Sequence, residues 1–202
     1  AQRSVRWTFD PSCATPTISP IDSIIPVNIS TIIYLCKNNK AIRHMGKNET
    51  IILGISIGDL NGIGPEVVLK AFEDPRMLEF CTPIIFASSK LLSWYTKHFE
   101  TTLILNSIDR LDAVVPNKVN VFNCWKEPFV VQFGTTNKEA GRLAIASLKS
   151  ATKALKDGQI NALVTAPIEK KNSQSEEFSF PGHTDYLAKE LGGKSLMFMI
   201  SE

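Results

Sequence analysis

The chain has 202 residues, of which 44% are hydrophobic and 21% are charged, so it can bury one core, or one domain and part of another. Its formal net charge of +2 comes from interspersed lysines and arginines, and a chain without a basic stripe is not expected to bind nucleic acid. The four cysteines are scattered, which predicts reduced thiols in a cytoplasmic protein, and the longest apolar run, at 24–36, is too short and too polar to span a bilayer.

The first 44 residues differ in composition from the rest of the chain. Four prolines recur, Ser and Thr are dense, and no helical or strand period lasts for ten residues. The first methionine is Met45. We therefore interpret residues 1–44 as an unstructured leader or as a non-native segment upstream of the true start, and residues 45–202 as the folded part.

A regular alternation of strands and helices begins at Ile51. The residues that follow form an almost uninterrupted β-branched run, which is typical of a strand that helices cover on both faces. Such alternation predicts an α/β fold with a largely parallel sheet and flanking helices. We expect strands at 51–57, 84–87, 101–105, 119–122, 160–164 and 196–200, and helices that begin at Gly64, near Leu91, at the capping-box sequence 136–139 and at Asp185.

The last expected strand, at 196–200, is followed by only two residues. A domain normally finishes with a polar tail or a terminal helix, so we expect this fold to continue beyond Glu202.

The first motif that could carry chemistry is the glycine-rich loop at 58–66. It matches neither a Walker A motif nor a dinucleotide fingerprint, because the required lysine and third glycine are missing. Glycines alone would indicate only a tight strand-to-helix turn. Asp59 and Asn61, however, place a carboxylate and an amide after a parallel strand, where α/β enzymes bind ligands, so both are candidate contacts to a hydroxylated ligand.

A second polar cluster follows the strand at 160–164. Thr165 ends this strand, and a loop with Lys170 and Lys171 comes next. Thr165 and Lys170 are weaker candidates for contacts to a phosphate. A pair of adjacent lysines also occurs often in a solvated loop.

The sequence Gly182-His183-Thr184 precedes the short helix expected at 185–191. We expect Thr184 to cap this helix, so that an imidazole, a hydroxyl and free backbone N–H groups converge on one point. Such a site suits a phosphate or a carboxylate. The alternative is that Thr184 only caps the helix and His183 only packs. The three histidines form no recognisable metal or triad pattern, so we assign no metal ligand, catalytic residue or cofactor contact.

Segments 55–66, 162–168 and 180–187, in this order and spacing, resemble the 4-hydroxythreonine-4-phosphate dehydrogenases of vitamin B6 synthesis. The resemblance covers about residues 45–202. It implies an isocitrate/isopropylmalate-dehydrogenase-like fold with two α/β domains, an active site between them, and a homodimer. It also implies oxidation of 4-phosphooxy-L-threonine with NAD or NADP, followed by decarboxylation to 3-amino-2-oxopropyl phosphate, with a divalent metal ion that polarises the reacting oxygen.

In the pattern of that family, the His-Thr pair binds the substrate, and here this pair is His183 and Thr184. The three metal-binding histidines of the family, and most cofactor contacts, lie downstream of the part that this chain matches. The resemblance therefore implies an amino-terminal portion of the enzyme, truncated at its carboxyl end, without dehydrogenase activity by itself. Two alternatives stay open: a non-catalytic module that binds phosphate or carboxylate, and a related dehydrogenase of another phosphorylated hydroxy acid.

Overall fold

The computed structural model describes residues 32–35, 50–173 and 178–193. The chain divides into two units, Ala1–Ser30 and Thr31–Glu202, and every described element belongs to the second. The strand expected at 196–200 lies outside the described residues. The elements are β1 (Ile32–Leu35), β2 (Ile51–Ser56), α2 (Gly64–Ala71), α3 (Met77–Phe80), β3 (Cys81–Ala87), α4 (Ser89–His98), β4 (Leu105–Ile108), the 3-10 helix η1 (Leu111–Ala113), β5 (Val119–Asn123), α5 (Lys138–Lys156), β6 (Ala162–Thr165), α6 (Lys170–Ser173) and α7 (His183–Glu190).

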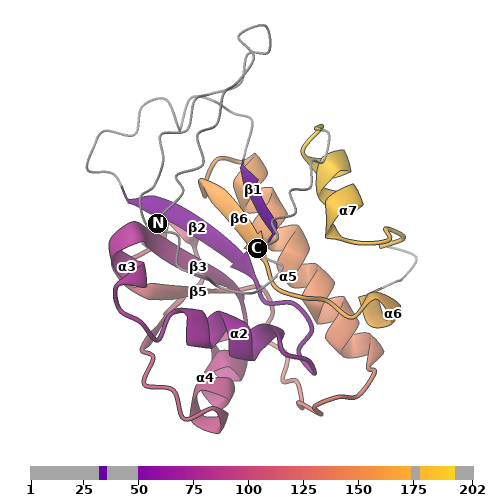
Figure 1. Cartoon of the computed structure of the whole chain (residues 1–202), viewed down its shortest axis with the longest axis horizontal. Helices are drawn as coiled ribbons and strands as arrows, with labels where there is room; N and C mark the ends of the chain where they lie inside the picture. Colours follow the sequence, from indigo (N-terminus) through magenta and orange to yellow (C-terminus); the bar gives the residue numbers. More distant parts are fainter. Residues whose placement is uncertain (1–31, 36–49, 174–177, 194–202) are drawn as a thin grey trace, which may run out of the picture. The chain divides into compact units, whose positions relative to one another are not determined.

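The strands form one sheet in the order β1-β6-β2-β3-β5-β4 (Figure 1). All neighbouring strands run parallel except β1, which is antiparallel to β6. From β2 the chain first builds β3, β4 and β5 on one side and then returns to place β6 on the other. The switch in direction therefore lies between β2 and β6, and in such sheets the ligand crevice lies at the carboxyl ends of these strands.

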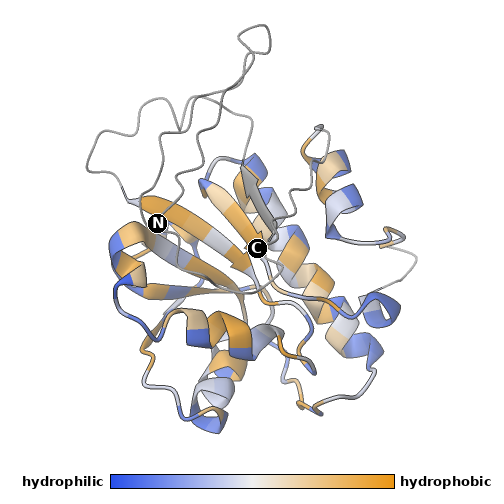
Figure 2. Ribbon diagram, in the orientation of Figure 1, coloured by the Kyte–Doolittle hydropathy of each residue, from blue (hydrophilic) through white to orange (hydrophobic). Residues whose placement is uncertain are grey.

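Two apolar cores sandwich the sheet, and the expected α/β fold with a largely parallel sheet is confirmed. One core packs α2 and α4 against β2, through side chains such as Leu69, Leu92 and Tyr95. The other packs α5 and α7 against β3 and β6, through side chains such as Leu148, Leu163 and Leu187. Figure 2 shows the hydrophobic strands inside and the hydrophilic outer faces of the helices.

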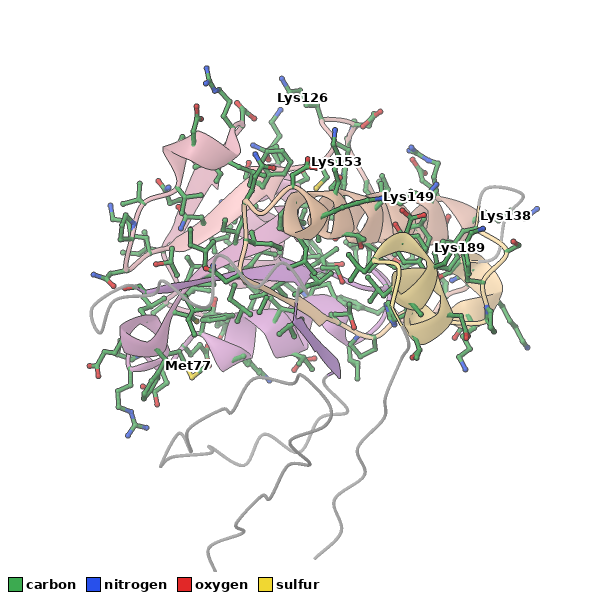
Figure 3. The ribbon with its side chains drawn as sticks, turned by 90° about the horizontal axis from the view of Figure 1, so that it is seen from above. Met77, Lys126, Lys138, Lys149, Lys153 and Lys189 are labelled. Atoms are coloured by element: carbon green, nitrogen blue, oxygen red, sulfur yellow. The ribbon has the colours of Figure 1, made fainter. Side chains whose placement is uncertain are left out.

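The α5 helix shows why the second layer forms. Its Asn137 N-cap accepts a 2.7 Å hydrogen bond from the backbone N–H of Glu139, so the cap is Asn137 and not the first residue of the capping-box sequence. The helix buries one face against the sheet and exposes lysines on the other. Lys138 and Lys153 of α5 and Lys189 of α7 all lie on the surface (Figure 3).

The structure differs from two strand expectations. β1 forms within the segment that we expected to be an unstructured leader, because β6 would otherwise expose an unpaired edge and Ile32-Ile33-Tyr34-Leu35 favours strand. The strand expected at 101–105 is shifted to Leu105–Ile108, where it pairs with β5. Among the helices that the structure describes, none combines the length and the hydropathy that a bilayer span requires.

Candidate functional site

The loops that follow β2 and β6 are bonded to each other. The backbone N–H of Asp59 donates a 2.8 Å hydrogen bond to the carbonyl oxygen of Pro167. Gly58 makes this approach possible, because its φ is +74° and a Cβ atom there would lie 2.3 Å from the same oxygen. The two loops therefore meet at the switch between β2 and β6, where a ligand is expected.

Asp59 presents a half-buried carboxylate at this junction. Burial raises its pKa, the hydrogen bond from the Asn61 backbone N–H opposes the shift, and the nearby charge of Glu169 raises the pKa further. Asp59 forms no ion pair with any residue in the described ranges. Its carboxylate therefore has no cationic partner among the described residues.

Asn61 is only 2% exposed, and its side chain is engaged by the protein itself. Its Oδ1 accepts a 2.9 Å hydrogen bond from the Gln132 backbone N–H, and its Nδ2 donates to the carbonyl oxygen and the hydroxyl of Thr135 at 3.2 Å each. The backbone N–H of Gly134 also donates to the Asn61 carbonyl oxygen. In this structure Asn61 joins the first loop to the turn before α5.

Thr165 and Lys170 lie on the β6 side of the junction between the two loops. Thr165 ends β6, is buried, and stands opposite Ser56 in the β2–β6 register. The Ser56 hydroxyl is buried and has no hydrogen-bond partner within the described ranges. Lys170 is the exposed first residue of α6, a short helix in the segment that we expected to be a loop.

His183 and Thr184 are the first two residues of α7. The helix begins two residues before Asp185, where we expected it to begin, because Gly182 and not Thr184 is the N-cap, and no side chain caps the helix. The Thr184 hydroxyl is therefore not used as the cap. The His183 Nε2 is buried and has no hydrogen-bond partner among the described residues, and burial lowers the pKa of this imidazole to about 4, so the ring is neutral at physiological pH.

The packing of α7 sets the direction in which His183 lies. Tyr186 meets Thr152 of α5, and one turn later Glu190 pairs with Lys156 at 3.8 Å, so the two helices run in the same direction. The first turn of α7 consequently lies toward Ser147, whose hydroxyl bonds the Ile57 N–H and the Phe86 carbonyl oxygen at the carboxyl ends of β2 and β3. His183 and Thr184 thus lie toward the same sheet edge as the two loops.

Two polar residues of this region were not candidates in the sequence. The Asn172 side chain in α6 is buried, and neither its amide nitrogen nor its amide oxygen has a hydrogen-bond partner in the described part of the chain. The buried hydroxyl of Ser56 likewise has none there. Ser56 could have been noticed as the one hydroxyl in an apolar strand run. No sequence signal marks Asn172, because its burial depends on the contact between α6 and Gly141 of α5.

The described residues do not fit a metal or a dinucleotide site. No group of three His, Cys, Asp or Glu side chains within these ranges could hold a metal ion. The β2–α2 loop lacks the third glycine of a dinucleotide fingerprint.

A family model described as "Pyridoxal phosphate biosynthetic protein PdxA" matches residues 79–202. The chain belongs to this PdxA family. A 4-hydroxythreonine-4-phosphate dehydrogenase of Bacteroides thetaiotaomicron is 42% identical over 156 residues, which are 76% of this chain and 43% of that protein. A Clostridium botulinum protein whose name includes D-threonate 4-phosphate dehydrogenase is 27% identical over 70% of this chain and 43% of its own length.

Solved structures agree with the PdxA assignment. The crystal structure of a 4-hydroxythreonine-4-phosphate dehydrogenase from Burkholderia phymatum matches with a TM-score of 0.67 and 25% identity, over 73% of this chain and 46% of that chain. The chain thus spans less than half the length of the relatives it matches. The resemblance to this family is confirmed.

Proposed function

We propose that residues 45–202 supply the amino-terminal part of a cytoplasmic, homodimeric 4-hydroxythreonine-4-phosphate dehydrogenase, and that segment 1–44 precedes this part. The enzyme would oxidise 4-phosphooxy-L-threonine, and the product would decarboxylate to 3-amino-2-oxopropyl phosphate. The names of the relatives support this reaction. NAD or NADP would accept the hydride and a divalent metal ion would polarise the reacting oxygen, both held by residues outside this chain.

The part of the site that this chain supplies would bind the phosphorylated substrate through His183 and Thr184. The observation that carries this proposal is the buried, unpartnered Nε2 of a neutral His183 at the first turn of α7. Leaving such an atom without a partner costs about 1–3 kcal/mol, which a bound substrate would recover. A substrate phosphate, or a hydroxyl next to it, could be bound by three groups. These are the N-terminus of α7, the Thr184 hydroxyl, which does not cap the helix, and the neutral imidazole ring.

Three further residues would complete this half of the crevice. Lys170 supplies a cation for the phosphate, Thr165 a hydroxyl at the end of β6, and Asp59 a carboxylate for the substrate's amino or hydroxyl group. Asn61 would act indirectly, since its side chain holds the loop that carries Asp59.

Calorimetric titration of 4-phosphooxy-L-threonine into the 202-residue chain tests the proposal. We expect binding that His183→Asn and Thr184→Val each weaken about tenfold, the value of one lost polar contact of 1.4 kcal/mol. His98→Asn, on the exposed end of α4, is the matched control and should not change affinity. Unchanged affinity in both site variants would contradict substrate binding by His183 and Thr184. Formation of NADH by this chain with added metal would contradict the expectation that the chain alone has no dehydrogenase activity.

The names of the Clostridium botulinum relatives favour a second candidate, a dehydrogenase of D-threonate 4-phosphate. This compound carries a hydroxyl group in place of the charged amino group, so its binding would depend less on the charge of the Asp59 carboxylate. A titration with both compounds distinguishes the two: a preference for 4-phosphooxy-L-threonine that Asp59→Asn removes supports the first proposal. Binding of either phosphorylated compound by the complete protein without any binding of nucleotide or metal would instead indicate a non-catalytic module.

A further inference from the structure

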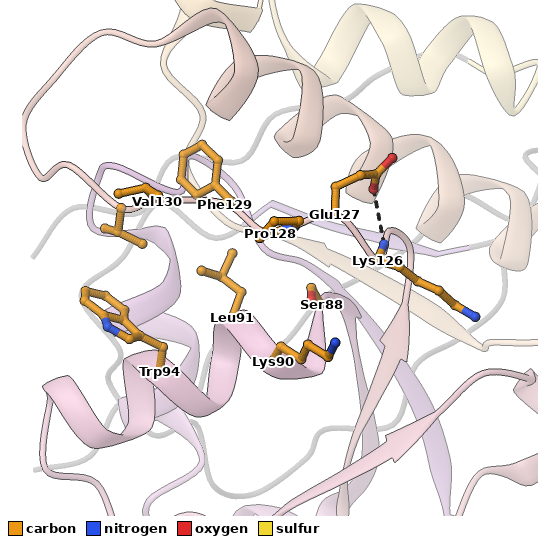
Figure 4. A pocket seen from close by; sticks show the side chains of 10 residues that line it. Ser88, Lys90, Leu91, Trp94, Lys126, Glu127, Pro128, Phe129 and Val130 are labelled. Carbon is orange, nitrogen blue, oxygen red and sulfur yellow. Dashed lines mark hydrogen bonds between the residues drawn. The ribbon is translucent and has the colours of Figure 1, made fainter.

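A cavity of about 450 Å³ lies between α4 and the segment that follows β5 (Figure 4). Its walls come from residues 88–94 and 126–131, so it shares no lining residue with the candidate site described above. Small-molecule sites in proteins have volumes of roughly 300–1,000 Å³, and this cavity falls within that range. Figure 4 shows Ser88, Lys90, Lys126 and Glu127 toward one end and Trp94, Phe129 and Val130 toward the other.

The polar end is built on the start of α4. Ser88 is its N-cap and is only 4% exposed, yet its hydroxyl does not cap the helix and has no hydrogen bond to any described residue. The backbone N–H groups of Lys90 and Leu91 likewise have no acceptor in the described part of the chain. The backbone N–H of Ser89, by contrast, donates a 2.8 Å hydrogen bond to the Asn123 Oδ1. Three donors therefore remain available beside the cavity.

The charge of this end is positive. Lys90 and Lys126 are exposed, and neither forms an ion pair with a residue that the structure describes. Glu127 is the single acid among the lining residues, and its carboxylate accepts a 3.2 Å hydrogen bond from the Lys126 backbone N–H. Two ammonium groups, a free hydroxyl and a helix N-terminus together complement an oxyanion.

The opposite end is apolar and partly open. Trp94 is 43% exposed and Val130 is 75% exposed, while Leu91 forms a buried wall between the two ends. The Trp94 ring stacks on His98 with centroids 5.0 Å apart and planes 6° apart, so it offers a fixed flat surface. A planar or branched apolar group fits such a wall better than a polar one.

We propose that this cavity binds a small aromatic anion. Its phosphate or carboxylate is held by the Ser88 hydroxyl, the first turn of α4 and the two lysines, and its ring lies against Trp94 and Val130. Both ends contribute, so the whole molecule binds more tightly than either half. The site is separate from the substrate crevice and lies in the same chain.

Phenyl phosphate is the first probe, with inorganic phosphate and phenol as its two halves and benzoate as the carboxylate analogue. Titration into the 202-residue chain should give an affinity for phenyl phosphate at least about tenfold higher than for either half, since each end adds a contact worth 1.4 kcal/mol or more. The ratio of phenyl phosphate to benzoate affinity identifies the preferred anion. The sequence has three tryptophans, so the Trp94 indole N–H signal, assigned by its loss in Trp94→Phe, should shift with phenyl phosphate.

Variants assign the two ends separately. Lys90→Gln and Lys126→Gln should each weaken phenyl phosphate and inorganic phosphate about tenfold, whereas Trp94→Ala and Val130→Ser should weaken phenyl phosphate alone. Lys97→Gln is the matched control, an exposed lysine of α4 that does not line the cavity. His183→Asn should have no effect, because that residue belongs to the other site.

Equal affinity for phenyl phosphate and inorganic phosphate would overturn the proposal, because the apolar end would then contribute nothing. The proposal also fails if Lys97→Gln weakens binding as much as Lys90→Gln does, since that result indicates unspecific attraction to surface charge. An effect confined to His183→Asn would place the probe in the substrate crevice and would overturn the second site equally.

Discussion

The backbone carbonyl oxygen of Asn172 lies against Gly141, so close that a Cβ atom on Gly141 would be only 1.9 Å from it. Gly141 is in the first turns of α5, where alanine is intrinsically better for a helix by about 1 kcal/mol. The close approach of α6 opposes this preference. The glycine therefore allows α6, and with it Lys170, to lie at the edge of the crevice.

Gly141→Ala is expected to destabilise the protein by about 1–3 kcal/mol, the usual cost of overpacking, because a backbone atom cannot move aside as a flexible side chain can. Urea unfolding followed by circular dichroism measures this change. Helix propensity by itself predicts the opposite sign, so a more stable variant would show that α6 does not pack as described.

Gly58→Ala should destabilise the protein by about 2 kcal/mol or more, because the new Cβ atom adds a clash with the Pro167 carbonyl oxygen to a left-handed backbone. Gly158→Ala is the matched control. Its φ of +72° is almost the same, and nothing lies within 4 Å of the added atom, so only the conformational cost of about 1 kcal/mol remains. Equal losses in the two variants would mean that the two loops are not in contact.

Asn61→Ala should lower the free energy of unfolding by about 2–3 kcal/mol, since it removes the acceptor of the Gln132 N–H and two hydrogen bonds to Thr135. Thr135→Val removes one of these bonds and also the bond that the Thr135 hydroxyl donates to the Gln132 carbonyl oxygen, so it should cost about 1–2 kcal/mol. Chemical denaturation of both variants and of the double variant tests the pair. Because the two residues share a bond, the double variant should lose less than the sum of the single losses.

The sequence predicted most of the parallel core, and the exceptions share a physical cause. The β-branched run at 51–57 and the amphipathic pattern around Leu92 are local signals, and β2 and α4 follow them. The partner of Asn61 is 71 residues away at Gln132, so no local pattern indicates that its amide is engaged. The prediction that Thr184 caps α7 was wrong, because Gly182 is the N-cap. The strand β1 was not predicted because it forms by pairing with the edge strand β6, which exists only in the folded sheet.

Acid should weaken the folded state through His183. Its pKa is about 4 in the folded protein and 6.5 ordinarily, so between these values the unfolded chain binds more protons and stability rises with pH. The neutral ring therefore contributes fully above pH 6.5, and its contribution is lost as pH falls toward 4, by about 3 kcal/mol in all. Asp59 acts in the opposite sense, because its raised pKa favours the folded state at low pH.

Urea unfolding of the wild type and of His183→Asn between pH 4 and 7 isolates this contribution. The wild type should lose stability steeply below pH 6.5, and the variant should show a flatter profile, since asparagine does not titrate and the effect of Asp59 is retained. His98→Asn is the matched control, at an exposed histidine of α4 whose ring stacks on Trp94. Parallel profiles for the wild type and His183→Asn would mean that the imidazole is solvated, and the buried Nε2 would then no longer support substrate binding by α7.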